Sequence, residues 1–386
     1  MNFIIYFHSE NRKLKCKRLR KTLKALEKKF NFLIYPGENE YAIEFFPSAL
    51  LYLQFKEGTV SGSSALAHLG PGFHNFLYEF LDVLGDNLGT DFIFDDETGY
   101  QFHRDFESLR KLYDAEVLKT LEGCLKSESS LLGWANPEWL PLPVPGYLYT
   151  PTGSWRYDDL KRTLQNNSED FLLKYYIWPN PEKDAYFFRN LGLLLLWTEF
   201  VWVEPRFPED KKLATKILVC FERARDLQPD IELPGEDIEA VKKILSGKEA
   251  KGKTYRSGDV FYQLSGWTAV VGGDFLHEIK GEIHFFWKKD KNIRIWPAKL
   301  SSKEEEFKIE RMIGSEGEKF EFEANGCSYR ARLKEEKEEG IVLYTLIGVI
   351  QSGNDYALVN ISCKEETDIQ WLLDTFASIF RDPKNQ

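Results

Sequence analysis

The chain has 386 residues and a formal net charge of −10, and 43% of its residues are hydrophobic and 15% aromatic. This length exceeds that of a usual single domain, so we expect two or three domains with sizeable cores. The acidic balance argues against nucleic acid as a partner, because such binding needs a basic footprint. Five scattered cysteines without a C-x-x-C pair indicate free thiols, and we expect a cytoplasmic protein.

Residues 1–130 predict a mixed α/β domain. Short apolar runs at 3–7, 31–35, 41–46, 51–55 and 91–94 are typical of strands. Residues 11–30, 73–88 and 105–125 predict helices. The first helix has an apolar stripe that includes Leu19, Leu23 and Leu26, and its other faces are rich in Lys and Arg. Those charges could dock an acidic partner, a lipid or RNA, but the regular stripe favours packing on the sheet, with hydrated lysines.

Residues 131–165 change in character, because prolines alternate with Trp and Tyr. Proline resists both helix and central strand, so we expect an ordered connector that lies over a domain surface. Its rings are a candidate protein interface, since Tyr and Trp supply contact area at low entropic cost. The alternative is that they attach the first domain to the helices that follow. The candidate interface residues are Trp134, Trp139, Tyr147, Tyr149 and Trp155.

The remainder predicts a helical segment, a linker and a strand-rich domain. Residues 166–247 are expected to be helical and packed on the first domain, including a helix over 184–203. The apolar run at 191–203 is too short to cross a bilayer and contains Glu199, so no membrane segment is expected. Residues 248–258 predict a polar linker, and 259–386 an antiparallel α+β domain with a closing helix. The expected fold class is therefore mixed α+β with several domains.

The last third of the chain resembles the Mog1/PsbP-like α/β sandwich. The resemblance rests on GWTAVVGG at 266–273, YALVNISC at 356–363 and the helix IQWLLDTFASIF at 369–380. It implies a binding or accessory role rather than catalysis, although a fold by itself does not assign a function. Residues 1–250 match no family in this way.

A Gly-Pro-Gly turn precedes the helix expected at residue 73. Exposed N–H groups at a helix start attract anions, and glycine lets a ligand approach the backbone. Gly70, Gly72 and His74 are therefore a candidate anion site, although a Walker loop would also need a lysine. A simple glycine-rich turn is the alternative.

The chain has one concentration of polar residues that could support chemistry. His74, Asp95, Asp96, Glu97 and His103 combine imidazole and carboxylate, the ligands that zinc, iron and manganese use. None of the helical ligand spacings of metal enzymes is present, so a solvated turn with a structural hydrogen bond is the alternative. We expect no metal and no cofactor.

No catalytic motif can be identified, since there is no G-x-S-x-G and no cysteine in a catalytic context. The sequence favours a non-enzymatic protein that acts through contact with an unknown protein partner, as an accessory, inhibitor or immunity-type protein. The alternative is an enzyme or small-anion or metal binder that uses residues 70–74 and 95–103.

Overall fold

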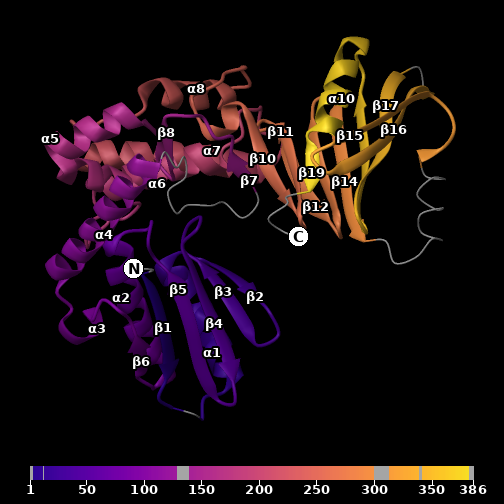
Figure 1. The fold of residues 1–386 in the computed structure, drawn as a ribbon. Helices are drawn as coiled ribbons and strands as arrows, with labels where there is room; N and C mark the ends of the chain where they lie inside the picture. Colours follow the sequence, from indigo (N-terminus) through magenta and orange to yellow (C-terminus); the bar gives the residue numbers. More distant parts are fainter. Residues whose placement is uncertain (1–2, 12, 128–138, 300–312, 339–340, 382–386) are drawn as a thin grey trace. The chain divides into compact units, whose positions relative to one another are not determined.

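The computed structural model describes residues 3–11, 13–127, 139–299, 313–338 and 341–381. The fold is mixed α+β, as predicted, and its sheets are antiparallel throughout the described residues. The chain divides into two compact units (Figure 1). Unit 1 comprises residues 1–134, 143–200 and 204–248, and unit 2 comprises 135–142, 201–203 and 249–386. Each unit is described separately.

Unit 1 begins with a six-stranded sheet in the order β2-β3-β4-β5-β1-β6. Its strands are β1 (Ile4–Ser9), β2 (Leu33–Pro36), β3 (Glu40–Glu44), β4 (Leu50–Lys56), β5 (Thr59–Ala65) and β6 (Phe92–Asp95). The helices of the unit are α1 (Cys16–Phe30), α2 (Pro71–Leu88), α3 (Tyr100–His103), α4 (Phe106–Ser127), α5 (Tyr157–Tyr175), α6 (Ala185–Leu194), the π-helix η1 (Leu195–Glu199), α7 (Pro208–Leu227) and α8 (Gly235–Leu245). A short hairpin is formed by β8 (Tyr147–Thr150) and β9 (Gly153–Arg156).

The strands of this sheet alternate between a buried and an exposed face. In β1, Ile5 and Phe7 are buried while Tyr6 and His8 are exposed. The same alternation runs along β4, and it is typical of an antiparallel sheet that is covered on one side. Figure 1 shows the strands in front of α1. One face of the sheet therefore builds the core, and the other is left open.

The helices on the covered face supply an aromatic core. The stripe of α1 is buried as predicted, with Leu23 only 1% exposed, and the helix ends where Asn31 adopts a left-handed conformation. Phe45 from the sheet side packs edge to face against Phe73, Phe76 and Phe80 of α2. Such edge-to-face pairs stabilise a core beyond the area that they bury.

The middle of the chain differs from the prediction in two places, one in the predicted connector and one in a predicted helix. The predicted connector already contains β8, β9 and the start of α5, whose first residue is Tyr157. The helix predicted over 184–203 is α-helical only to Leu194, continues as η1 and stops at Glu199. The prediction over 200–203 was wrong because apolar content alone does not reveal where a helix ends.

Unit 2 contains two antiparallel sheets and a closing helix. The smaller sheet, in the order β19-β11-β10-β7, consists of β7 (Trp139–Pro141), β10 (Asp259–Leu264), β11 (Trp267–Gly272) and β19 (Ile379–Arg381). The larger sheet, in the order β12-β13-β14-β18-β17-β16-β15, consists of β12 (Leu276–Lys280), β13 (Ile283–Lys288), β14 (Lys291–Lys299), β15 (Glu318–Ala324), β16 (Cys327–Glu338), β17 (Ile341–Ser352) and β18 (Asp355–Cys363). The helices of the unit are the short 3-10 helices η2 (Tyr255–Ser257) and η3 (Glu366–Asp368) and the α-helix α10 (Ile369–Ala377).

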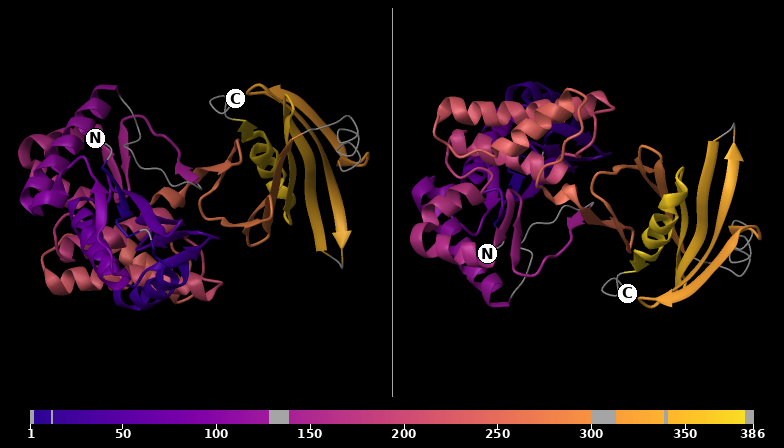
Figure 2. Two further views of the ribbon diagram at one scale, coloured as in Figure 1. Left: turned by 90° about the horizontal axis from the view of Figure 1, so that it is seen from below. Right: turned by 90° about the horizontal axis from the view of Figure 1, so that it is seen from above.

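Helix α10 covers one face of the larger sheet, as Figure 2 shows. Leu372 and Phe376 of the helix are buried, and the Phe376 ring packs edge to face on Tyr329 of β16. Tyr329 also donates a hydrogen bond to the carbonyl of Ile379, which ties β19 to this sheet. The predicted closing helix thus completes the core of unit 2.

The predicted linker is not uniformly exposed. Residues 246–249 are exposed, but Thr254, Tyr255 and Arg256 are buried. The guanidinium of Arg256 donates to the carbonyls of Gly273 and Phe275 and to the Tyr262 hydroxyl. The second half of the segment is therefore part of unit 2. None of the helices in the described part of the chain is long and apolar enough to cross a membrane.

Candidate functional site: an open tyrosine face and a buried histidine network

The open face of the unit 1 sheet carries a row of three tyrosines, which we call the tyrosine face. Tyr35 on β2, Tyr52 on β4 and Tyr6 on β1 are 51%, 53% and 52% exposed. Ala42 of β3 is paired with both Tyr35 and Tyr52, and Ser63 of β5 with both Tyr52 and Tyr6. The tyrosines are therefore two strands apart, about 10 Å, with a small side chain in each gap.

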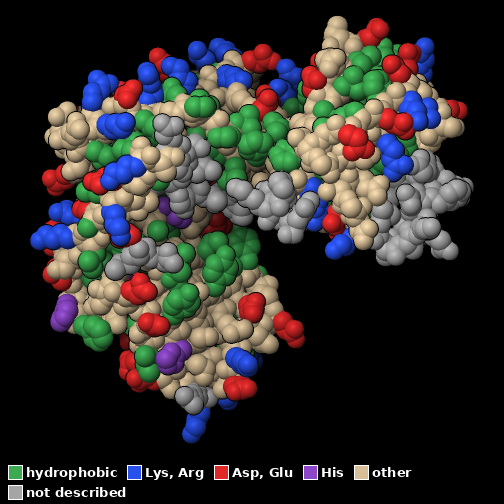
Figure 3. All heavy atoms as spheres, viewed as in Figure 1, with side chains coloured by type: hydrophobic (Ala, Val, Ile, Leu, Met, Phe, Trp, Pro, Cys, Tyr) green, Lys and Arg blue, Asp and Glu red, His purple; other side chains and the backbone are tan. Residues whose placement is uncertain are grey.

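The tyrosine face holds an unusual share of the exposed apolar surface. Of fourteen exposed large hydrophobic side chains among the described residues, five lie on this one sheet: the three tyrosines with Leu33 and Ile93. An open hollow of about 790 Å³ lies over it. The space-filling view shows hydrophobic and acidic side chains together over these strands (Figure 3). Exposed apolar side chains gathered on one surface mark an interaction site more often than isolated exposed residues do.

Polar side chains form a second row beside the tyrosines. Glu40, Gln54, Ser61 and His8 occupy successive strands in register. The Gln54 amide donates to Glu40 Oε1 at 3.2 Å, and the Tyr35 hydroxyl donates to Glu44 Oε2 at 2.7 Å. That bond, chiefly, raises the pKa of Tyr35 to about 12 and fixes its ring on the sheet. The face thus combines aromatic area with hydrogen-bonding groups.

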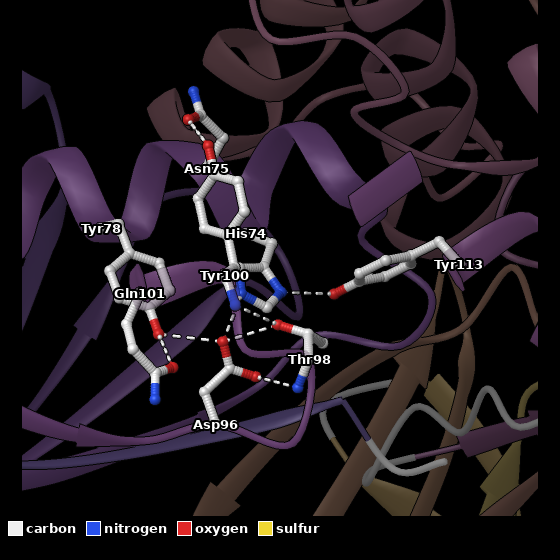
Figure 4. Close-up of polar contacts among 8 residues, drawn as sticks. All are labelled: His74, Asn75, Tyr78, Asp96, Thr98, Tyr100, Gln101 and Tyr113. Atoms are coloured by element: carbon white, nitrogen blue, oxygen red, sulfur yellow. Dashed lines mark hydrogen bonds and ion pairs between the residues drawn. The ribbon is translucent and has the colours of Figure 1, made fainter. Parts of the chain in front are cut away.

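A second group of polar side chains is buried between α2 and the 95–104 segment. His74 Nε2 lies 3.1 Å from Asp96 Oδ2, and His74 Nδ1 lies 3.1 Å from the Tyr113 hydroxyl (Figure 4). Asp96 also accepts hydrogen bonds from the Tyr78 hydroxyl and from the backbone N–H and hydroxyl of Thr98. His74, Tyr78 and Tyr113 are 0% exposed.

Burial and hydrogen bonds determine the protonation states of His74 and Asp96. Burial lowers the pKa of His74 and outweighs the opposing effect of Asp96, so the imidazole is neutral. Its Nε2–H then donates to Asp96 while Nδ1 accepts from the Tyr113 hydroxyl. Burial raises the pKa of Asp96, but its hydrogen bonds more than offset this and hold the pKa below its usual value. Every polar atom of His74 therefore has a partner, and the ring is closed to solvent.

The Gly-Pro-Gly turn is closed by the chain itself. The Gly72 N–H donates to the carbonyl of Trp178 at 2.9 Å, and the Trp178 N–H donates to the carbonyl of Leu69 at 2.8 Å. A β-carbon on Gly72 would lie 2.1 Å from the Asn180 carbonyl oxygen, and Gly70 has a φ of +95°. The glycines are thus required for close approach of residues 176–180. The N–H of Gly72 is already used within the protein.

The remaining residues of the two predicted clusters are dispersed. Asp95, Glu97 and His103 are exposed, and only His74 and Asp96 of that cluster come together. Among the described residues, no group of three His, Cys, Asp or Glu side chains is arranged to hold a metal ion.

The candidate interface rings in the connector have different positions. Trp139 and Tyr149 are 1% and 5% exposed, so both are core residues of their units. Tyr147 and Trp155 are partly exposed, and the Trp155 ring packs edge to face on Phe171. Trp134 lies outside the described residues.

The sequence pattern did not single out Tyr6, Tyr35 or Tyr52. Their strands were predicted, and the alternation in residues 50–56, LLYLQFK, is the signal that could have put Tyr52 on the face opposite its buried neighbours. What was missing was the strand order, which brings tyrosines from β1, β2 and β4 into one row. That order depends on pairings between distant segments.

Comparison with known proteins identifies no family for this chain. No family model and no curated protein matches it. Solved structures show a weak likeness to the chain, and two of them illustrate it. One is a protein from Bacteroides thetaiotaomicron, at 13% identity and a TM-score of 0.26, with 31% of this chain and 47% of that one covered. The other is the Saccharomyces cerevisiae Ran-binding protein Mog1p, at 10% identity and a TM-score of 0.25, with 33% of this chain and 98% of Mog1p covered. The chain thus spans about half the length of the first, and the resemblance to Mog1p is weak.

Proposed function

We propose that this is a cytoplasmic, non-enzymatic protein that acts by binding another protein, as an accessory, inhibitor or immunity-type protein, through the tyrosine face of unit 1. The observation that carries the proposal is the row of Tyr35, Tyr52 and Tyr6, each about half exposed on an open sheet. We assign to unit 2 a Mog1/PsbP-like sandwich, on the basis of its antiparallel sheets and closing helix.

The composition of the face favours a protein partner. Tyrosine side chains are rigid and amphipathic, so they supply contact area at a small entropic cost, and small or hydroxyl residues between them adapt to a partner. Here Ala42 and Ser63 occupy the gaps, and Ser61 and Gln54 supply hydrogen-bonding groups alongside. Protein interfaces are enriched in tyrosine relative to the rest of the surface.

Site-specific cross-linking tests this function. A photoreactive phenylalanine analogue at position 52 should link the protein to one defined partner, and the same analogue at position 219 should not. Val219 is the matched control because it is 53% exposed but lies on α7, away from the sheet. Cross-links of equal yield and identity from both positions would contradict the proposal.

The competing function, an enzyme or small-ligand binder at residues 70–74 and 95–103, has less support. The His74 ring is fully buried with both nitrogens bonded, and the Gly72 N–H is bonded to Trp178. A substrate or ion would have to displace these contacts. Zinc, manganese or phosphate that raises the melting temperature of the wild type but not of the His74→Gln variant would favour this function.

A further inference from the structure

Each tyrosine of the tyrosine face has a carboxylate beside it. Glu44 accepts the Tyr35 hydroxyl bond at 2.7 Å. Asp95 of β6 is the register partner of Tyr6 on β1. Glu40 on β3 is diagonal to Tyr52 on β4, since Glu40 pairs with Gln54 and Ala42 with Tyr52. Three aromatic rings and three carboxylates thus form neighbouring pairs on one surface.

The charge of this surface is one-sided. The outward-facing carboxylates are Glu40, Glu44 and Asp95, whereas the outward-facing strand positions hold a single lysine, Lys56, at the end of β4. Three carboxylates and one lysine give these strand positions a net charge of −2, with His8 left out of the count. The basic residues of this part of the chain are instead concentrated on α1, whose buried leucines lie on the covered side of the sheet.

We propose that the tyrosine face binds a partner protein through exposed lysine and arginine side chains of that partner. This rests on the proposed function and names the chemistry of the partner. A cationic side chain lies favourably over a tyrosine ring, and its charged end can reach a carboxylate beside the ring. Tyr35 with Glu44, Tyr52 with Glu40 and Tyr6 with Asp95 each provide both elements.

The geometry sets a spacing for such a partner. The three pairs lie about 10 Å apart along a line that crosses the strands, because they are separated by two strand spacings. The small side chains Ala42 and Ser63 leave room between the rings for the partner's backbone or apolar side chains. Acidic surfaces of this kind also steer basic partners during association, so binding should weaken as salt is added.

A peptide selection tests this chemistry before the partner itself is identified. A phage-displayed library of random peptides is selected on the full-length wild type and, in parallel, on a Tyr6→Thr/Tyr52→Thr variant. Threonine keeps the strand preference of these positions while removing the rings. Val219→Ser serves as the control, because it alters an exposed side chain of unit 1 away from the sheet. Binding of the selected peptides is then measured on Glu40→Gln/Glu44→Gln/Asp95→Asn.

We expect Lys- and Arg-rich peptides to be enriched on the wild type, to bind Val219→Ser equally well, and not to be enriched on the threonine variant. Their affinity for the amide variant should be at least tenfold weaker than for the wild type. Tyrosine-dependent peptides that are neutral or acidic would overturn the inference but leave the proposed function intact. A third outcome would overturn both the inference and the proposed function: no tyrosine-dependent peptides are selected, and the tyrosines instead mediate binding to glycans or self-association.

Discussion

His74 and Asp96 are 22 residues apart in the chain and joined by a 3.1 Å hydrogen bond in the interior of unit 1. The bond connects α2 to the segment that follows β6, and Tyr113 extends the connection to α4. Because the imidazole is neutral and enclosed, the network holds three elements together only while His74 remains unprotonated. Its stabilising effect should therefore depend on pH.

Acid should destabilise the protein through His74. Its folded pKa is below the unfolded value of about 6.5, so the unfolded chain takes up a proton that the folded chain does not as pH falls below that value. The contribution of His74 to the free energy of unfolding is complete above pH 6.5. It is lost on acidification, by up to about 1.4 kcal/mol per pH unit. Urea denaturation from pH 8 to pH 5 should show a smaller pH dependence for His74→Gln than for wild type.

His103→Gln is the matched control for that comparison, because His103 is exposed. It removes an exposed imidazole and leaves the buried network in place, so it shows whether the effect is specific to His74. Asp96 has a lowered folded pKa, so its own contribution is lost only at more acidic pH, below about 3.9. Equal slopes for wild type and His74→Gln between pH 6.5 and pH 5 would mean that His74 is protonated in the folded protein.

Two glycine substitutions should have opposite effects. Gly72→Ala places a β-carbon 2.1 Å from the Asn180 carbonyl oxygen, so the free energy of unfolding should fall by about 1–3 kcal/mol or more, as overpacking does. A β-carbon at Gly123, within α4, would meet no atom within 4 Å apart from the backbone of its own helix, so Gly123→Ala should stabilise the protein by roughly 0.5–1 kcal/mol. Thermal denaturation of both variants provides the measurement. A Gly72→Ala variant that is as stable as the wild type would show that Gly72 is not in close contact with residues 178–180.

The apolar stripe of α1 should carry the stability of that helix. Leu23 is 1% exposed, so Leu23→Ala should lower the free energy of unfolding by about 2–5 kcal/mol. Lys17→Gln and Lys21→Gln should change it little, because both lysines are exposed and solvated surface charges contribute little. Chemical denaturation distinguishes the two classes. A neutral Leu23→Ala would mean that α1 is not packed on the sheet in solution.

Proteolysis should distinguish the two halves of the predicted linker. Lys248 and Lys251 are exposed, whereas Arg256 is buried with its guanidinium bonded to two carbonyls. Within residues 246–258, trypsin should therefore cut after the lysines first, since exposed polar segments are the preferred sites of cleavage. Mass spectrometry of the early fragments identifies the bonds. Early cleavage after Arg256 would show that η2 is not held in unit 2.

Local pattern predicted much of the fold, and pairing between distant segments determined the rest. The stripe of Leu19, Leu23 and Leu26 gave α1 its buried face, because helical period is a property of neighbouring residues. The Gly-Pro-Gly turn is closed by Trp178, which lies more than a hundred residues further along the chain. Because no local pattern shows that contact, the turn was interpreted as a candidate anion site. Likewise, Tyr6 joins Tyr52 only through β5, which no local pattern reveals.

The central claim is that the tyrosine face is where a partner protein binds, and one measurement tests it most directly. Once the partner cross-linked at position 52 is purified, its dissociation constant is measured by calorimetry for wild type, Tyr6→Thr/Tyr52→Thr and Val219→Ser. We predict at least a tenfold weaker affinity, about 1.4 kcal/mol, for the threonine variant, and an unchanged affinity for Val219→Ser. Equal affinity of the partner for all three proteins would contradict the claim.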